Sequence, residues 1–346
     1  MPDPLLEVDD LHVSFVTEDG LVNAVDGVSF TLSPGEVLAV VGESGSGKSV
    51  TAMTLLGLTR SPNSRFSGSA RLRGEELIDA PDEKLEKIRG AEIAMIFQDP
   101  ISSLSPVHRV GDQIVEQIRA HEDVSKAEAL DRAVDLMERV GIPRARDRAR
   151  SYPHEFSGGM RQRVMIAMAL SLSPGVLIAD EPTTARDVTI QAQILLEMKQ
   201  LATQRETAII FVTHDLGVVA DIADRVLVMY SGRVVEAGSL DDVFYDPQHP
   251  YTWGLLGSIT RMDREPPRRL PTIPGQPPSL LNPPEGCHFR PRCPHEFDRC
   301  PQVPALESRV EDAPEHVDRC WLSVEEKRSR RQVAGQIGLA TEDVIA

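Results

Sequence analysis

The residues with the clearest chemical character form the loop Gly42-Glu43-Ser44-Gly45-Ser46-Gly47-Lys48-Ser49, which fits the pattern G-x-x-x-x-G-K-[ST]. Glycines let such a loop curl until successive backbone N–H groups face phosphate oxygens. We expect Lys48 to reach the β- and γ-phosphates of a nucleotide and Ser49 to ligate Mg²⁺, with Val50 beside them. A flexible Gly/Ser turn carrying a surface lysine is the alternative. The apolar run before the loop and the helical pattern after it favour the phosphate site, because a helix N-terminus attracts anions.

Two carboxylates at the end of another apolar run supply the second half of such a site. The run "VLIAD" ends at Asp180, and Glu181 follows it directly. By itself, an Asp-Glu pair after a strand is usually the start of a solvated loop. Together with the phosphate loop it indicates nucleotide hydrolysis, in which Asp180 holds Mg²⁺ and Glu181 activates the attacking water as a general base.

Short apolar runs predict the strands that must position these residues. Residues 5–41 are typical of strands broken by turns, and the runs at 176–180 and 208–213 predict buried strands. The stretch 225–238 predicts a hairpin with Ser-Gly at its turn. Because strands alternate with helical patterns, we expect a parallel α/β sheet.

A long helical stretch interrupts this alternation. Residues 99–172 have helical spacing of apolar side chains, and Ser125 and Glu128 show the pattern of a capping box. We expect this stretch to form an inserted helical subdomain within an ATP-binding unit of residues 1–265. A Pro-dense segment then leads to an extension at 266–325 and a charged tail at 326–346.

Length and charge limit the class of protein. A chain of 346 residues allows about two domains. Its net charge of −16 argues against a nucleic-acid partner, because nucleic-acid binders usually carry a basic surplus. No run of residues is apolar enough to span a bilayer, and the acidic start lacks the features of a signal peptide. We therefore expect a protein of the cytosol.

All four cysteines lie in the extension, at Cys287, Cys293, Cys300 and Cys320. Disulfides are rare in the cytosol, so the cluster suggests a metal site. The gaps are wider than those of zinc knuckles, and four thiolates can hold a [4Fe–4S] cluster. Zinc and unmetallated thiols are the alternatives. The nearby histidines, His288, His295 and His316, are expected to support the site or to be solvated.

Between the phosphate loop and the carboxylate pair stands "FSGGMRQRV", and here the chain resembles the ATP-binding cassette (ABC) ATPases. The resemblance implies an ABC cassette: a RecA-like parallel core, an antiparallel β subdomain and an inserted helical subdomain. It also implies that Ser157, Gly158, Gly159 and Met160 open a helix whose N-terminus acts on the ATP of a partner subunit.

Three further positions match that family in order. Phe15 stands where an aromatic ring stacks on adenine, although a core phenylalanine is the alternative. Gln98 resembles the glutamine that touches Mg²⁺ and the attacking water. His214 resembles the switch histidine that contacts the γ-phosphate. These roles are implied by the resemblance alone.

Several longer stretches are similar to the ATPase subunits of dipeptide, oligopeptide and nickel importers. They are "VGESGSGKS", "FQDPISSLSP", "YPHEFSGGMRQRV", "HPYTWGLLGSI" and "GCHFRPRCP". The resemblance implies an ATPase that powers uptake through two transmembrane permease subunits, fed by an extracytoplasmic solute-binding protein. It implies a peripheral position at the cytoplasmic face of the inner membrane and a paralogous second ATPase chain. It also associates the cysteine pattern with a [4Fe–4S] cluster.

One position departs from that family. After "EPTTA" the family usually has Leu-Asp, whereas this chain has Arg186-Asp187. The resemblance places Asp187 at the nucleotide and this loop on the dimer seam. Arg186 would need an acid or a phosphate there, so seam packing and basal hydrolysis are in doubt.

Two other classes of protein compete with the importer. A non-transport ABC ATPase of DNA repair or translation is the first, but the long coiled coils of repair types and the second cassette of translation types are missing from the sequence. A metal or redox module with an accessory ATPase is the second, and only the cysteine-rich tail supports it.

Overall fold

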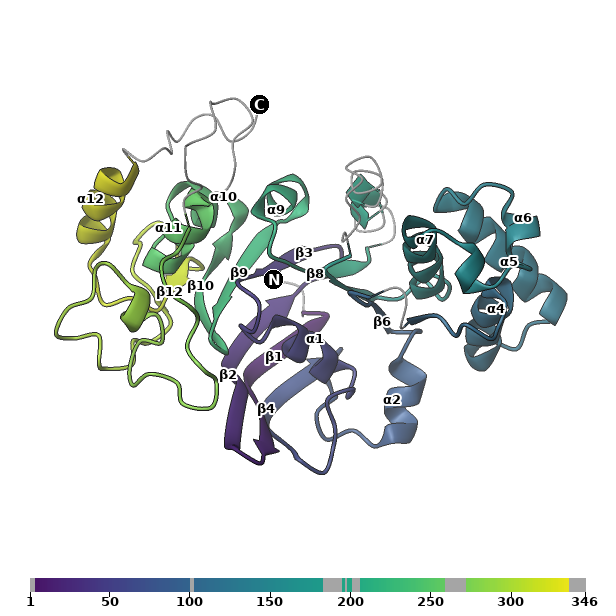
Figure 1. The fold of residues 1–346 in the computed structure, drawn as a ribbon, viewed down its shortest axis with the longest axis horizontal. Helices are drawn as coiled ribbons and strands as arrows, with labels where there is room; N and C mark the ends of the chain where they lie inside the picture. Colours follow the sequence, from purple (N-terminus) through teal and green to yellow (C-terminus); the bar gives the residue numbers. More distant parts are fainter. Residues whose placement is uncertain are drawn as a thin grey trace.

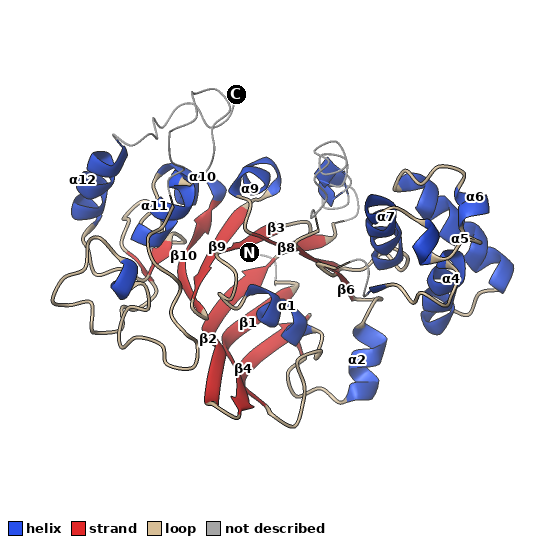
Figure 2. Ribbon diagram, viewed as in Figure 1, coloured by secondary structure: helices blue, strands red, loops and turns tan. Residues whose placement is uncertain are grey.

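The computed structural model describes residues 4–99, 103–182, 195–196, 198–200, 206–258 and 272–335 (Figure 1). Two sheets lie next to each other at the centre, with a group of helices at one side and the C-terminal extension at the other (Figures 1 and 2). Within the described residues, no helix has the length and apolar character needed to cross a membrane.

The larger sheet has eight strands in the order β11-β12-β10-β9-β3-β8-β7-β6. Neighbouring strands from β9 to β6 run parallel, and their side chains are almost all buried, as expected for strands covered on both faces. The bounds of these five strands are β3 Val37–Val41, β6 Ile93–Ile96, β7 Val176–Asp180, β8 Ala208–Thr213 and β9 Arg225–Tyr230. The predicted parallel α/β sheet is confirmed.

The hairpin predicted at 225–238 is formed by β9 and β10 (Arg233–Ser239), which run antiparallel. Its turn residues Ser231 and Gly232 have φ values of 48° and 81°. Two consecutive positive φ values are the requirement of a tight type I′ turn, which explains the Ser-Gly pair.

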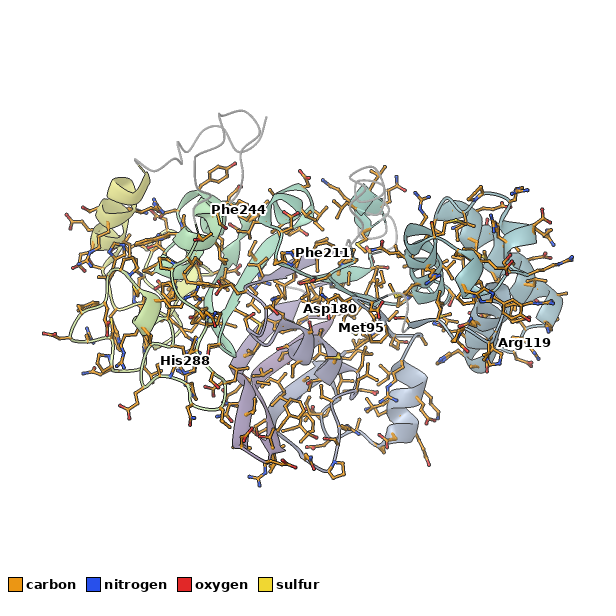
Figure 3. The ribbon with its side chains drawn as sticks, in the orientation of Figure 1. Met95, Arg119, Asp180, Phe211, Phe244 and His288 are labelled. Carbon is orange, nitrogen blue, oxygen red and sulfur yellow. The ribbon has the colours of Figure 1, made fainter. Side chains whose placement is uncertain are left out.

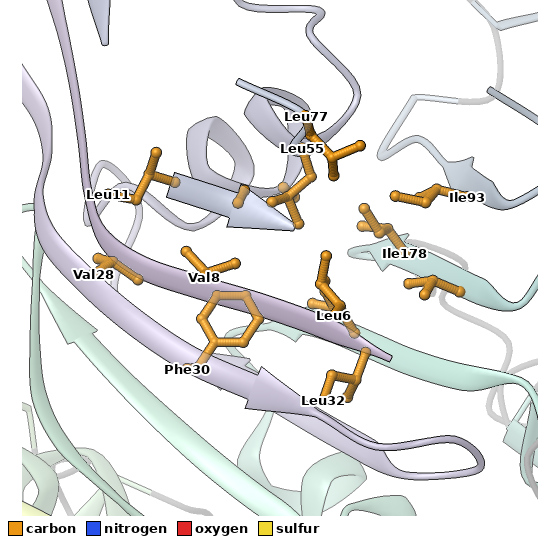
Figure 4. Packing of buried hydrophobic residues seen from close by; sticks show 14 of the residues in the cluster. Leu6, Val8, Leu11, Val28, Phe30, Leu32, Leu55, Leu77, Ile93 and Ile178 are labelled. Atoms are coloured by element: carbon orange, nitrogen blue, oxygen red, sulfur yellow. The ribbon is translucent and has the colours of Figure 1, made fainter. Parts of the chain in front are cut away.

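The smaller sheet is antiparallel, in the order β2-β1-β4-β5. Its strands are β1 Leu6–Thr17, β2 Gly20–Leu32, β4 Ser64–Leu72 and β5 Glu75–Glu76. The inward face, with Leu6, Val8 and Leu11, packs on Leu55 of α1 (Lys48–Leu55) and on Ile178 of the larger sheet (Figure 4). One apolar core therefore fixes the antiparallel sheet against the strand and helix that flank the phosphate loop.

The helices between β6 and β7 build a second core. Their bounds are α4 Val110–His121, α5 Lys126–Arg139, α6 Ala145–Arg148 and α7 Gly158–Ala169. Buried aliphatic side chains such as Ile114, Ala133 and Val164 join them. Ser125 caps α5, its Oγ accepting the N–H of Glu128 at 3.2 Å, as the sequence pattern predicts. A short helix, α2 (Asp82–Ile88), lies before β6.

The extension continues the larger sheet. β12 (Val317–Asp318) pairs with β10, and β11 (Glu307–Ser308) pairs with β12. The helices α9 Leu216–Ile222, α10 Leu240–Tyr245 and α11 Pro250–Gly257 precede the extension; η2 Arg290–Arg292 lies within it, and α12 Val324–Gly335 runs from its end into the charged tail. Lys327 of α12 is fully buried, and its Nζ donates to both oxygens of Asp318 at 2.8 Å. The Pro- and Cys-rich segment thus shares the core and the sheet of the ATP-binding unit.

Candidate active site

The phosphate loop joins β3 to α1, and two of its glycines are required by close backbone approaches. Gly42 has a φ of 152°, and a Cβ there would lie 2.2 Å from the carbonyl oxygen of Met229. Gly47, with a φ of 102°, leaves no room either, because a Cβ would lie 2.4 Å from the carbonyl oxygen of Ala24. Any larger residue at these positions would force the loop away from the strands that shape it.

Lys48 lies across the loop that it belongs to. Its Nζ donates to the carbonyl oxygens of Gly42 at 2.7 Å and Glu43 at 2.9 Å, and the residue is 6% exposed. Burial lowers the pKa of Lys48, although the charges of Glu181, Asp180 and Glu43 act against this shift. The ammonium group is therefore held over the N-terminus of α1, where an anionic ligand would be attracted.

Ser49 and Asp180 face each other across the carboxyl end of β7. The Ser49 Oγ donates to Asp180 Oδ1 at 3.0 Å. Burial raises the pKa of Asp180; the bond from Ser49 and the charge of Lys48 oppose this, and Glu181 adds to it. A hydroxyl and a carboxylate oxygen are the ligand types that Mg²⁺ prefers, so this pair fits the ion. Figure 3 shows Asp180 at the centre of the molecule, near Met95.

Glu181 brings together the ends of three neighbouring strands. Gln98 Nε2, after β6, donates to its carboxylate at 2.7 Å, and His214 Nδ1, after β8, lies 2.9 Å from it. The backbone of Glu181 is left-handed, with a φ of 45°, and its N–H donates to the carbonyl oxygen of Val212 at 2.8 Å. A non-glycine residue with this φ is strained, and such strain concentrates at functional sites. Glu181 and Gln98, expected to act on the attacking water, thus share one cluster with His214, expected to contact the γ-phosphate.

Ser157 lies at the N-terminus of α7, away from this cluster. Its Oγ accepts the N–H of Met160 at 3.4 Å, and Gly158 and Gly159 form the first turn of the helix. Ser157 is exposed. Helix α7 packs on α4, α5 and β6, and it stands apart from α1 in Figure 1. The signature residues therefore form a separate surface, not part of the same nucleotide site.

Phe15 lies in the antiparallel sheet, away from this cluster. Phe15 is half-buried in β1, opposite Val22 and Ser64 in the neighbouring strands, and packs on the apolar core. Its adenine role stays a prediction. Arg186 and Asp187 lie outside the described residues.

Two residues that sequence reasoning missed hold the first variable residue of the phosphate loop. The N–H of Glu43 donates to the Tyr251 hydroxyl at 2.8 Å, and Arg292 makes two bonds to the Glu43 carboxylate, at 2.6 Å and 3.1 Å. Tyr251 lies within the "HPYTW" stretch, but no local pattern ties it or Arg292 to a loop more than 200 residues away.

A groove of about 270 Å³ opens beside the Gln98 loop. Its walls come from the turn after α1, from β6 and from α7, and include Leu58, Met95, Phe97 and Met165. Leu58 and Phe97 are 44% and 37% exposed. The groove thus presents apolar side chains between the sheet and the inserted helices. One of them, Phe97, directly precedes Gln98.

The cysteine cluster does not form the iron–sulfur site that the spacing suggested. All four cysteines line one cavity of only about 20 Å³, together with aromatic residues such as Phe289 and Trp321. That is the room of about one water molecule, far less than four irons and four sulfides need. Among the described residues, no three His, Cys, Asp or Glu side chains are placed to hold a metal ion.

The side chains around the cysteines are packed and hydrogen-bonded within the fold. Burial raises the pKa of Cys293 and of Cys320 to about 12. His288 is hydrogen-bonded to the carbonyl oxygen of Ser231, and His316 is hydrogen-bonded to the carboxylate of Glu236. The cysteines pack as small apolar residues, as Cys287 and Cys293 do against Phe289 and Tyr251. Packing on the ATP-binding unit, and not a cluster, orders the extension.

Comparison with known proteins agrees with this geometry. Residues 25–184 match the ABC transporter family, and residues 235–300 match the C-terminal region of oligopeptide/dipeptide transporters. A dimeric ATP-binding cassette in a post-hydrolysis state with ADP and Pi superposes with a TM-score of 0.62 at 25% identity, over 68% of this chain and 98% of that one. The protein cbiO1 from Clostridium perfringens, part of the ABC transporter complex cbiONQ, superposes with a TM-score of 0.58 at 29% identity, over 70% and 91% of the two chains.

Similar sequences extend over nearly the whole chain. The oligopeptide transport ATP-binding protein OppD of Salmonella typhimurium is 53% identical over 322 residues, covering 93% of this chain and 95% of its own. The dipeptide transport ATP-binding protein DppD of Bacillus subtilis is 48% identical, covering 92% and 94%. Neither name points to an iron–sulfur protein. The chain belongs to the family of ABC ATPases that serve as ATP-binding subunits of oligopeptide and dipeptide importers.

Proposed function

We propose that this chain is one of two ATP-hydrolysing subunits that drive uptake of di- or oligopeptides through a pair of transmembrane permease subunits. An extracytoplasmic solute-binding protein delivers the solute, and the chain sits peripherally at the cytoplasmic face of the inner membrane. The second ATPase is a paralogue of this chain. The similarity to the oligopeptide and dipeptide transport proteins OppD and DppD supports peptide transport, and the family resemblance supports the assembly.

The observation that carries the proposal is the meeting of the loop at 42–49 with Asp180 and the Glu181 cluster. Bound Mg²⁺ would be held by Ser49 and Asp180, with Gln98 close by, and would offset negative charge on the β- and γ-phosphates. The backbone N–H groups of the loop and Lys48 bind the phosphates. These residues position ATP at the carboxyl ends of β7 and β8.

Glu181 acts on the attacking water in this proposal. Its carboxylate accepts the proton as the water attacks the γ-phosphate. Gln98 and His214 both bond to this carboxylate, so they set its orientation before the nucleotide arrives. With a γ-phosphate in place, His214 would contact it, and Gln98 would face the Mg²⁺.

The signature helix completes a partner's site. Because Ser157 is exposed and lies on a surface separate from α1, its N-terminus is suited to meet a nucleotide on another cassette. Two such contacts would close a dimer around two ATP molecules. The groove beside Gln98 then receives a short amphipathic helix of the permease, because its wall is apolar and includes Phe97. A movement of that helix would shift Phe97 and the adjacent Gln98, which donates a hydrogen bond to Glu181.

Purification of the intact complex from membranes tests this function. We expect the chain to copurify with two permease proteins and a paralogous ATPase, and the complex in vesicles to take up short peptides only with Mg-ATP. A Lys48→Ala chain should assemble but support no uptake. Copurification with ribosomes or DNA and no membrane partner would favour the non-transport alternative.

A further inference from the structure

The phosphate loop is held from behind by the C-terminal extension. Glu43, the first variable residue of the loop, is bonded through its N–H to Tyr251 and through its carboxylate to Arg292. Arg292 belongs to η2 of the extension, and Tyr251 belongs to α11, which precedes it in the chain. The loop that receives the phosphates is therefore joined directly to the extension.

Arg292 is a buried side chain with several hydrogen-bond acceptors around it. Its side chain is 4% exposed. Besides Glu43, it donates to the carbonyl oxygens of Pro274 at 2.9 Å and Ile273 at 3.2 Å and to the Tyr230 hydroxyl at 3.3 Å. A planar guanidinium that holds both oxygens of one carboxylate fixes its distance and its orientation.

An aromatic cluster locks this anchor to the sheet. The rings of Tyr230, at the end of β9, and Tyr251 lie 4.6 Å apart. Phe289 of the extension is 2% exposed, and its ring centre lies 5.3 Å from that of Tyr230 and 5.4 Å from that of Tyr251. Burial raises the pKa of Tyr251 far above its usual range, so its hydroxyl stays neutral beside Glu43. Because Phe289 packs on Tyr251, a movement of the extension would also move the Tyr251 ring, whose hydroxyl accepts the N–H of Glu43.

The charges around Lys48 give this contact a consequence for ATP. Glu181, Asp180 and Glu43 all act on the single ammonium group of Lys48. Of these carboxylates, Glu43 alone has a guanidinium bonded to both oxygens among the described residues. Without Arg292, the Glu43 carboxylate would compete with phosphate for Lys48 and would repel the incoming nucleotide.

We propose that Arg292 is a positioning residue for ATP binding: its pair with Glu43 keeps that carboxylate off Lys48 and fixes the entrance of the phosphate loop, so that docking of the extension sets the affinity for ATP. The extension is thereby a part of the nucleotide site and not only an appendage. The proposal concerns affinity, while the water-activating cluster at Glu181 remains separate from it.

Three variants of the full-length chain test the proposal: Arg292→Met, Glu43→Gln and the double variant. We expect Arg292→Met to raise the Kd for Mg-ATP roughly fivefold or more, measured by calorimetry well below the unfolding temperature. The double variant should recover most of the lost affinity, because the unpaired carboxylate is then gone. Arg290→Met is the matched control; it changes the same short helix without touching the loop and should bind ATP as the parent does.

A purely structural role for Arg292 predicts a different pattern. It would lower the unfolding temperature and leave the Kd unchanged, or the double variant would bind ATP no better than Arg292→Met; either result overturns the proposal. If Arg292→Met does not fold, Arg292→Gln takes its place, because its amide can still donate to a backbone carbonyl oxygen of Pro274 or Ile273 but carries no charge to neutralise Glu43. Its Kd should be raised and then restored by Glu43→Gln, and failure of that restoration is equally decisive.

Discussion

Glu181 owes its position to a backbone conformation that few residues adopt. Its left-handed φ of 45° turns the side chain out of the β7 direction, so that the carboxylate meets Gln98 and His214 instead of continuing the alternation of the strand. The strain costs about 1–3 kcal/mol and is compensated by the bonds of the neighbouring strands. A carboxylate held by two neighbours before the reaction loses less freedom when it accepts a proton.

The Glu181→Gln variant should separate binding from hydrolysis. The amide keeps the shape of the side chain but cannot take a proton from water, so we expect hydrolysis to fall by about 10²- to 10⁴-fold while ATP binding is kept. Phosphate release and nucleotide binding by the assembled ATPase give the two values. Glu92→Gln, which alters a surface carboxylate paired with Arg73, is the control. Turnover at the parent rate in Glu181→Gln would mean that another group is the base.

At the scale of single elements, the phosphate loop and α7 present two helix N-termini to different places. The N-terminus of α1 follows directly on the phosphate loop, and Gly47, in the left-handed conformation, is its N-cap residue. The N-terminus of α7 carries the exposed Ser157 and the small residues Gly158 and Gly159. Small residues at an exposed helix start allow close approach of an anion that belongs to another molecule.

A Ser157→Arg variant distinguishes the two sites. The bulky side chain should block closure of two cassettes and abolish uptake, because it fills the surface that faces the partner. ATP binding by the isolated chain should be unchanged, since α1 and its loop are not altered. Equilibrium binding and cross-linking of the dimer with ATP are the measurements, and Ala120→Arg is a control at an exposed position of α4 in the same subdomain. Lost binding in the isolated chain would place Ser157 at its own nucleotide.

At the scale of the whole molecule, the extension and the ATP-binding unit share buried polar groups at their junction. Glu236 of β10, fully buried, accepts the N–H groups of Gln248 and His249 and a bond from His316. His249 Nδ1 in turn accepts the N–H of Tyr251 at 3.1 Å and so caps α11. The junction therefore depends on which of its histidines are protonated.

The pH dependence of unfolding reports on this junction. Burial, with a smaller effect from the charge of Lys327, lowers the pKa of His249 to about 3. The native state then binds fewer protons than the unfolded chain below the ordinary pKa of about 6.5. His249 thus contributes stability above that pH and loses it as the pH falls, at up to about 1.4 kcal/mol per pH unit.

His316 has the opposite sign. Burial alone would lower its pKa, but the bond to Glu236 and the charges of Asp242 and Asp318 raise it. Its contribution is complete below about pH 6.5 and is lost as the pH rises through its folded pKa. A His249→Asn variant keeps the cap, because the asparagine oxygen can accept the same N–H. It should flatten the loss of stability between pH 6.5 and 5, measured by urea unfolding, whereas the exposed control His154→Asn should not; equal slopes in both would contradict the role of His249.

Local patterns in the sequence determined the parts of this protein that consecutive residues build. The eight residues of the phosphate loop, the apolar run before it and the helix after it lie together along the chain, as do the Ser-Gly turn of the β9–β10 hairpin and the cap at Ser125. Such features depend on which residues tolerate a tight turn and on the spacing of apolar residues along the chain, and both can be read from consecutive residues. The carboxyl ends of adjacent parallel strands then bring Gln98, Glu181 and His214 to one place.

Only the tertiary structure decided what depends on contacts between distant segments. Cysteine spacing suggested an iron–sulfur site, but packing around Phe289 leaves only a small apolar cavity there. Composition predicted an extension after a Pro-dense segment, but not that β12 of this extension pairs with β10 and continues the central sheet. The pair of Arg292 with Glu43 joins residues 249 positions apart. Burial and charge at such sites arise from elements that meet only after folding, so no local pattern carries them.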